Sequence, residues 1–297
     1  MIQIQTFGAI DIGSNAVRLI ITSVYQTIET VQYKKITLVR VPIRLGEDVF
    51  TVGSIGEEKL QLLLETIHGF KHLLVAFGVS RFRACATSAM REATNASDVV
   101  KKVKEETGIS IEIISGEEEA FLIQSGGLAE MMDRRQHYLY VDVGGGSTEI
   151  VWYSNHETVT SKSFAVGSVR SLTRSVQDSV LEEMKDWLSM YAHDYPTPVV
   201  IGSGGNINRF LKLTGKEEGE PIKFKKLVNV YKQMLSMSYE ERLMNVNLSP
   251  HRADVIIPAL EIFISIMKIV GAKYIIVPKI GLGDGIIRQL FRESRIK

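Results

Sequence analysis

The chain contains two stretches of the same design, Asp11-Ile-Gly-Ser-Asn-Ala-Val-Arg-Leu-Ile-Ile21 and Asp142-Val-Gly-Gly-Gly-Ser-Thr-Glu-Ile-Val-Trp152. In each, an acidic residue ends an apolar strand, a turn containing glycine follows, and a second apolar strand begins. We expect Gly13 and the glycines at 144–146 to take positive φ and to leave backbone N–H groups uncovered. Because exposed amides of this kind bind anions, the repeat predicts two phosphate-binding hairpins in one chain.

Polar side chains accompany both turns. Ser14, Asn15 and Ser147 can donate hydrogen bonds to phosphate oxygens. Asp11 and Asp142 each place a carboxylate at the end of a strand, and carboxylate oxygens suit a magnesium ion that itself holds phosphate oxygens. We therefore expect the amides and Mg²⁺ to hold a phosphate chain together.

Length and composition favour a two-domain protein without a membrane segment. The chain has 297 residues, of which 45% are hydrophobic, and we place the domains at 1–125 and 126–297. Lys plus Arg (35) nearly balance Asp plus Glu (34), so no overall charge attracts nucleic acid. A single cysteine, Cys85, excludes an intramolecular disulfide and suits a reducing cytoplasm. The N-terminus has no signal-peptide pattern, and polar residues interrupt the apolar stretch 255–270.

The order of predicted elements repeats in the two halves. The first half predicts a hairpin and strands at 7–25, 29–41, 81–86 and 111–114, with helices at 56–77 and from Thr87. The second half predicts a hairpin at 138–153, strands at 157–164, 198–201 and 274–277, helices at 178–193 and 253–270, and a basic terminal helix. Each half is thus a βββαβα-type unit with a mixed sheet flanked by helices. Two such units with facing glycine hairpins predict an interdomain cleft, a preferred ligand site.

Glu119 is the candidate general base. It lies in the first turn of a predicted helix, three and four residues before Leu122 and Ile123, so its carboxylate lies on or beside the inward-facing apolar stripe. Partial desolvation raises the pKa of such a carboxylate toward a range useful for accepting a proton from water. A structural ion pair is the alternative. Ser115 and Glu118 have capping-box spacing, which explains them without a catalytic role.

Further glycine and arginine positions have two interpretations each. Arg91, in a helix that begins after a strand, can contact a phosphoryl oxygen or be an exposed first-turn residue. Gly204 and Gly205 belong to a turn that either lies close to a nucleotide, sugar or polyphosphate, or is an ordinary strand-to-helix connection. Gly126 and Gly127, within the helix predicted from Ser115, indicate close packing against the other domain.

A basic stretch follows the turn at 202–206. It is either a solvated face or a contact for a long polyanion, whose binding would depend on salt, and it comprises Arg209, Lys212, Lys216, Lys223, Lys225 and Lys226. The common alternatives fit poorly. The sequence has no GxxxxGK[ST] loop, no dinucleotide-binding glycine fingerprint after the first strand, no paired Cys/His spacing for zinc and no G-x-S-x-G elbow.

Together these motifs resemble the exopolyphosphatase and guanosine pentaphosphate phosphatase (Ppx/GppA) family of the actin, Hsp70 and sugar kinase superfamily. The resemblance rests on residues 9–19, 44–46, 86–91, 114–120, 141–149 and 252–258. It implies an α/β fold of two ribonuclease H-like domains with mixed sheets around an interdomain cleft. It also implies a cytoplasmic hydrolase, expected to be a homodimer, that uses Mg²⁺ to release orthophosphate from polyphosphate, or from guanosine pentaphosphate in the stringent response.

The resemblance also assigns roles to residues. Glu119 matches the general base, Glu149 a second essential carboxylate, and Asp142 a metal-associated aspartate, while Arg91 and the 144–147 turn match phosphate contacts. The predicted site therefore comprises catalytic Glu119, Glu149 and Arg91; phosphate-binding Gly13, Ser14, Asn15, Gly144, Gly145, Gly146, Ser147, Gly204 and Gly205; and metal-binding Asp11, Asp142 and Glu149.

Two departures and two alternatives accompany this interpretation. Gly283 stands where family members often have arginine. The chain also lacks the helical C-terminal region of longer members, and so we expect a preference for shorter phosphate chains. A non-catalytic polyphosphate or guanosine pentaphosphate sensor and an ATP-dependent small-molecule kinase remain the alternatives, because fold alone excludes neither.

Overall fold

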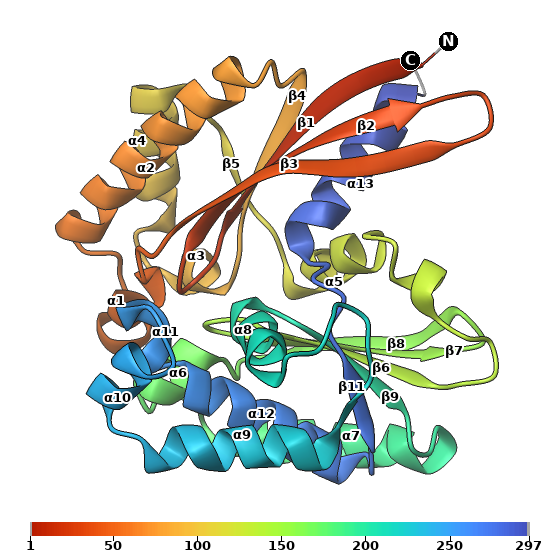
Figure 1. Cartoon of the computed structure of the whole chain (residues 1–297). Coiled ribbons are helices and arrows are strands. Elements are labelled where there is room, and N and C mark those ends of the chain that lie inside the picture. Colours follow the sequence, from red (N-terminus) through yellow and green to blue (C-terminus); the bar gives the residue numbers. More distant parts are fainter. Residues whose placement is uncertain (1, 296–297) are drawn as a thin grey trace. The chain divides into compact units, whose positions relative to one another are not determined.

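Each of the two repeated stretches forms a β-hairpin within its own sheet (Figure 1). The computed structural model of the protein describes residues 2–295. The first hairpin joins β1 (Gln3–Ile12) to β2 (Val17–Gln26), and the second joins β6 (Tyr138–Val143) to β7 (Thr148–Ser154). Both pairs are antiparallel, as the alternation of apolar and polar residues predicted.

The chain divides into two compact units. Unit 1 contains the described residues up to Gly127 and from Gly281 onward, whereas unit 2 is Leu128–Ile280. The expected domain boundary at 125/126 lies close to Gly127, where the chain first passes from unit 1 to unit 2. The expected second domain, however, included the terminal helix α13 (Leu282–Arg295), which packs against β1 in unit 1. An amphipathic pattern identifies a helix but does not specify which sheet it covers.

Unit 1 contains a five-stranded mixed sheet in the order β3-β2-β1-β4-β5. Strands β1, β4 and β5 are parallel, whereas β1, β2 and β3 are antiparallel. The remaining strands are β3 (Val31–Val41), β4 (Arg81–Ala86) and β5 (Ile111–Ile113). The helices before α13 are α1 (Leu45–Val52), α2 (Glu57–Ala76), α3 (Ser88–Glu92), α4 (Ala96–Thr107) and α5 (Gly116–Gln124).

Helices cover both faces of the unit 1 sheet. Both faces of β1 are therefore buried, which explains why apolar residues follow one another in this strand instead of alternating with polar ones. Ile10 and Ile12 join the core formed with α2 and α4. On the opposite face, the Phe7 ring meets the Phe291 ring of α13 edge to face, with centroids 6.1 Å apart. In Figure 1, α13 accordingly runs along the first hairpin.

Two glycines allow α13 to approach its neighbours closely. A Cβ atom at Gly285 would overlap the Leu122 carbonyl of α5, and one at Gly283 would overlap the Ile20 side chain of β2. Gly283 thus lies where no larger residue fits without movement of the Ile20 side chain. Asp284, between the two glycines, pairs with Lys35 of β3 at 2.9 Å.

Gly285→Ala should destabilise the protein by roughly 1–3 kcal/mol, because the added methyl group meets backbone rather than a movable side chain. Gly69→Ala is the matched control, since Gly69 lies within α2 with nothing near its Cβ position. The control should be neutral or stabilising by up to about 1 kcal/mol. Urea unfolding of both variants measures the difference, and equal stabilities would contradict the packing of α13 on α5.

Unit 2 contains a six-stranded mixed sheet in the order β10-β11-β9-β6-β7-β8. Its other strands are β8 (Glu157–Phe164), β9 (Val199–Ser203), β10 (Ile222–Lys223) and β11 (Tyr274–Ile276). Its helices are the 3₁₀ turn η1 (Leu128–Met131), α6 (Ser168–Leu172), α7 (Asp178–Asp194), α8 (Gly205–Thr214), α9 (Phe224–Ser236), α10 (Tyr239–Met244), α11 (Pro250–Ala253) and α12 (Ile256–Ile269).

The two sheets share one topology. Strands β8-β7-β6-β9-β11 repeat the order and directions of β3-β2-β1-β4-β5, and β10 adds an antiparallel edge strand. The predicted α/β class with two mixed-sheet domains is therefore confirmed. Side chains from α7, α8, α9 and α12 form one hydrophobic core with the unit 2 sheet.

The predicted extent of one helix was wrong. Helix α5 ends at Gln124, so Gly126 and Gly127 lie beyond it rather than inside it. Gly127 has a φ of 98°, and a Cβ there would overlap the guanidinium of Arg288 on α13. The contact is therefore within unit 1. Glycine at this place supplies the left-handed conformation that commonly follows a helix end.

No helix among residues 2–295 combines the length and the apolar composition that a bilayer crossing requires.

Candidate functional site

The predicted site residues of unit 1 lie at the carboxyl ends of parallel strands. Just beyond β1 and β4, the Thr87 amide donates to the Ile12 carbonyl at 3.1 Å. Just beyond β5, the Ile114 amide donates to the Ala86 carbonyl at 3.0 Å. The first hairpin turn, the start of α3 and the start of α5 therefore share one edge of the sheet, the edge at which open α/β sheets bind ligands.

The first turn has its carbonyls directed toward α1. The Ser14 carbonyl accepts the Gly46 amide at 2.8 Å, and the Asn15 carbonyl accepts the Arg44 amide at 3.2 Å. In a trans peptide the C=O and the next N–H point in opposite directions, so the amides of Asn15 and Ala16 face away from α1. Neither amide donates to another group within residues 2–295.

The second turn repeats this arrangement with α6. The Gly144 carbonyl accepts the Ser168 amide at 3.0 Å, and the Gly145 carbonyl accepts the amides of Val169 and Arg170 at 2.8 and 3.0 Å. The Gly146 carbonyl accepts Nε of Arg170 at 2.7 Å. The amides on the other side of these peptides, at 145–147, therefore face away from α6, and within the described chain they donate to no protein group.

The expected positive φ was wrong for Gly13 and for the glycines at 144–146, because none of them has it. Close packing against the second turn requires glycine at a different position. A Cβ at Gly167, before α6, would lie 2.5 Å from the Gly145 carbonyl group, so backbone packs on backbone here. The turn amides are thus without a protein partner although the backbone is not left-handed.

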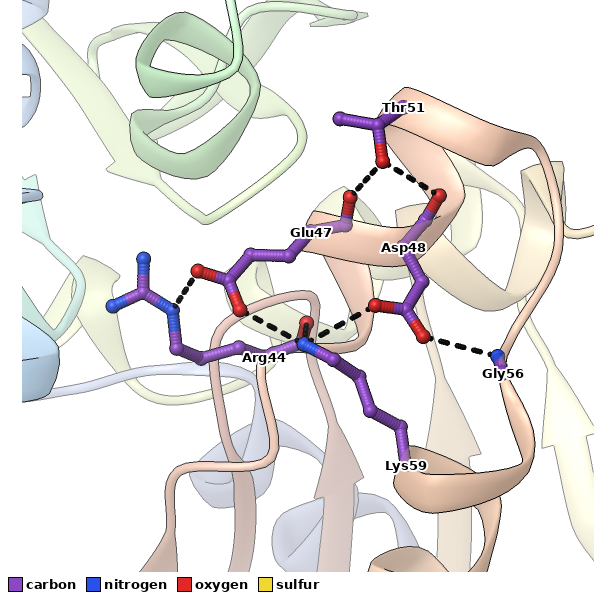
Figure 2. A network of polar contacts seen from close by, with 6 residues as sticks. All are labelled: Arg44, Glu47, Asp48, Thr51, Gly56 and Lys59. Carbon is purple, nitrogen blue, oxygen red and sulfur yellow. Dashed lines mark hydrogen bonds and ion pairs between the residues drawn. The ribbon is translucent and has the colours of Figure 1, made fainter.

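A polar network fixes the segment that contacts the first turn (Figure 2). Arg44 has a φ of 60°, and its carbonyl accepts Nζ of Lys59 at 2.6 Å. The same ammonium contacts Glu47 at 2.8 Å and Asp48 at 3.5 Å, and Asp48 also accepts the Gly56 amide at 3.0 Å. The network thus ties the start of α1 to the start of α2 and holds Arg44 in its left-handed conformation.

Arg170→Met should destabilise the protein by about 1–3 kcal/mol, because it leaves the Gly146 carbonyl without its buried donor. Arg174→Met is the control. Arg174 is exposed four residues later, and its replacement should change stability by no more than about 0.5 kcal/mol. Urea denaturation compares the two, and equal losses would show that Arg170 does not support the turn.

The two hairpins differ in charge. In unit 1, Asp11 faces Arg18 across the strands and pairs with its guanidinium at 2.9 Å. Burial raises the pKa of Asp11, and Arg18 opposes that rise. In unit 2, Asp142 faces Glu149 instead, so two carboxylates are direct cross-strand neighbours. Like charges placed this way repel, and a divalent cation relieves that repulsion.

Hydroxyl groups surround the unit 2 carboxylates. Tyr140 and Ser203 lie 3.3 and 3.2 Å from Oδ2 of Asp142, and both can donate to it. Ser147 and Ser163 donate to Oε1 of Glu149 at 2.7 and 3.0 Å. Burial and the nearby Asp142 raise the pKa of Tyr140 well above its usual value, so its phenol remains a protonated donor.

The glycine-rich turn after β9 lies beside Asp142. Gly204 has a φ of 110°, and a Cβ there would lie 2.6 Å from the Val143 carbonyl and 3.1 Å from Oδ1 of Asp142. Gly205 is the first residue of α8. Both the backbone conformation and the close approach therefore require glycine at 204. The predicted strand-to-helix turn thus lies next to Asp142 in unit 2.

Glu119 and Arg91 form an ion pair within unit 1. Glu119 is buried, with 8% of its surface exposed, and its Oε2 lies 3.1 Å from Nη1 of Arg91. The same nitrogen donates to the Ile114 carbonyl at 2.8 Å. The sequence predicted that Glu119 lies on the inward, buried face of its helix. The alternative to a catalytic role, a structural ion pair, is also present. Arg91 thus holds the candidate base at the strand edge.

Comparison with known sequences identifies the family. Residues 23–293 match the sequence profile of the Ppx/GppA phosphatase family. The chain belongs to this family. A bifunctional 3-dehydroquinate synthase/phosphatase of Fusobacterium nucleatum is 29% identical over 294 residues, which cover 91% of this chain and 44% of that protein. The chain thus spans less than half the length of this curated relative.

Solved structures of this family share the fold. An exopolyphosphatase from Cytophaga hutchinsonii aligns with a TM-score of 0.84 and 23% identity, covering 97% of this chain and 98% of the other. The Aquifex aeolicus Ppx/GppA family member aligns with a TM-score of 0.76 and 24% identity, covering 98% and 99%. Likeness at this identity establishes the fold, and family membership supports phosphatase activity.

Some positions of this Ppx/GppA chain differ from expectation in local detail. Ser115 caps α5 by accepting the Glu118 amide at 3.0 Å, but the Glu118 carboxylate pairs with Arg83 at 2.6 Å instead of completing the capping box. Ser14, expected to contact phosphate, lies 2.8 Å from the Ser88 hydroxyl and accepts the Ala89 amide. Its hydroxyl thus connects the first turn to α3.

Sequence reasoning missed several groups that surround the unit 2 acids. Tyr140, Ser163 and Arg170 belong to no glycine motif, and Ser203 lies in the 202–206 turn but was not singled out; their contacts depend on strand register and on the position of α6. Strand alternation could have placed Ser163 beside Glu149, because the two are cross-strand partners. No local signal indicates that Arg170 reaches the turn.

The basic stretch has mixed environments. Arg209 is structural, because it donates to the carbonyls of Val246 and Asn247, the latter at 2.8 Å. Lys216 pairs with Glu220 at 3.0 Å. The remaining four cations are exposed: Lys212, Lys223, Lys225 and Lys226.

Proposed function

We propose that this chain is an exopolyphosphatase that hydrolyses the terminal phosphate of inorganic polyphosphate and releases orthophosphate, with guanosine pentaphosphate as a second substrate. The observation that carries the proposal is the repeated turn, in which carbonyls are held by a helix so that consecutive amides face outward. Such amides suit phosphate oxygens. Family membership supports the hydrolytic chemistry.

In this proposal Glu119 accepts a proton from the attacking water. It is buried, and its contact with Arg91 fixes its position. Phosphoryl transfer depends mainly on positioning and on neutralising charge. The turn amides therefore supply most of the acceleration, and general-base assistance adds a factor of about 10² to 10⁴.

The residues of unit 2 fit a magnesium ion better than those of unit 1. Asp142 and Glu149 are adjacent carboxylates, whereas one oxygen of Asp11 already pairs with Arg18. Mg²⁺ commonly uses one or two carboxylates together with phosphate oxygens and water. Among residues 2–295 no cluster of three or more His, Cys, Asp and Glu could hold a metal; we assign Mg²⁺ to this pair on the adjacency of its two carboxylates. Bound there, the ion would neutralise phosphate charge.

Glu119→Gln should retain substrate binding and lose about 10²-fold or more of the turnover, because an amide cannot accept the proton. Orthophosphate release from medium-chain polyphosphate and from guanosine pentaphosphate measures this. Glu117→Gln is the matched control, since Glu117 is exposed two residues away, and it should remain as active as wild type.

The same assay separates the alternatives. Normal turnover by Glu119→Gln would refute the assigned role. Tight binding of both substrates without phosphate release by wild type would favour a sensor. Nucleotide-dependent phosphorylation of an added small-molecule acceptor would favour a kinase.

Asp142→Asn and Glu149→Gln should each weaken Mn²⁺ binding by about tenfold or more, because Mn²⁺ substitutes for Mg²⁺ at carboxylate sites. Asp11→Asn should leave the affinity within about twofold, because Arg18 already neutralises Asp11. Electron paramagnetic resonance of added Mn²⁺ reports binding without relying on activity. A loss confined to Asp11→Asn would place the metal in unit 1 instead.

A further inference from the structure

Unit 2 has a concave site at the end of its sheet opposite to Asp142 and Glu149. A cavity of about 320 Å³ lies among the loop before β6, the loop before β9 and the start of β11. Its polar lining comprises Arg135, Gln136, His137, Thr197, Lys273 and Tyr274. The volume is at the lower end of the range for small-molecule sites.

The cavity is separate from the acidic pair in the same unit. His137 immediately precedes β6, and Asp142 lies five residues further along that strand. At about 3.3 Å per residue the two are roughly 17 Å apart. The Val199 amide donates to the His137 carbonyl at 2.9 Å, which fixes the loops before β6 and β9 to each other. The site is therefore built on the amino ends of the strands.

The lining offers donors that the protein does not use. Across residues 2–295, the side chains of Arg135, Gln136, Thr197, Lys273 and Tyr274 make no hydrogen bond or ion pair with another protein group. Two of the five are cations, and the lining contains no carboxylate. The surroundings therefore favour an anion.

His137 adds a buried polar atom. Its Nδ1 is inaccessible and has no hydrogen-bond partner. The ring packs edge to face on Tyr195, with centroids 5.3 Å apart, so its orientation is set by packing. An atom that water cannot reach is also out of reach of a phosphate, so Nδ1 makes no contact with a ligand in the cavity, and His137 serves as a reporter in its lining.

We propose that this cavity binds a small phosphate anion, inorganic phosphate or pyrophosphate, between Arg135 and Lys273. Five donor side chains suit a tetrahedral group with three or four acceptor oxygens better than a carboxylate, which offers two. The site holds its ligand whether or not the chain hydrolyses polyphosphate, because it uses none of the groups assigned to that reaction.

The test follows the histidine ring resonances of the full-length protein by NMR while pyrophosphate, phosphate or acetate is added. The His137 signal is the one lost in His137→Gln. Saturable shifts of this signal with pyrophosphate or phosphate, and none with acetate at the same concentrations, are expected. The response should persist in Glu119→Gln, which shows that it does not depend on turnover at the hydrolytic site.

Charge-reversal variants provide a second test of the proposed phosphate site. Arg135→Glu and Lys273→Glu should each raise the dissociation constant at least about tenfold, as expected when a charge-assisted hydrogen bond is lost. Lys185→Glu, an exposed lysine of α7 away from the cavity, should leave it within about twofold. An unresponsive His137 signal, an equal response to acetate, or equal effects of all three reversals would each overturn the proposal.

Discussion

The hydrogen bonds from a helix start to the carbonyls of each glycine turn are the constraint on which the rest of the candidate site depends. Because a trans peptide points its C=O and the next N–H in opposite directions, holding the carbonyls determines where the amides face. Unit 1 achieves this with the segment from Arg44 to Gly46, and unit 2 with Ser168 to Arg170. Neither turn needs a left-handed glycine for this purpose.

The repeated hairpins share a backbone but carry different charges. The position opposite the strand-end aspartate is Arg18 in one unit and Glu149 in the other. The first hairpin is therefore neutralised internally, whereas the second concentrates negative charge that a cation can balance. A single backbone design thus carries an internally paired aspartate in one unit and two adjacent carboxylates in the other.

Glycine acts through close packing at several positions of this chain. Gly167 brings backbone against the second turn, and Gly285 brings α13 against α5. Gly204 combines close approach to Asp142 with a φ of 110°. At each position the absent Cβ creates room for a specific neighbour. The presence of a glycine in the sequence reveals neither which group lies beside it nor its φ value.

The sequence alone determined the elements and the repeat. Local patterns decide these features: the alternation in β1 and β2, the helical spacing of α2 and the acidic residue before each turn depend on residues adjacent in the chain. For the same reason Glu119 could be placed on a buried helix face. The basis was its spacing from the following apolar residues.

Only the tertiary structure decided which distant groups meet. The pairing of Glu119 with Arg91, the contact of Arg170 with the second turn and the packing of α13 in unit 1 join residues far apart in sequence. Hydrophobic patterning selects a face to bury but not the partner that buries it. The partner follows from sheet order and helix packing, which are properties of the folded chain as a whole.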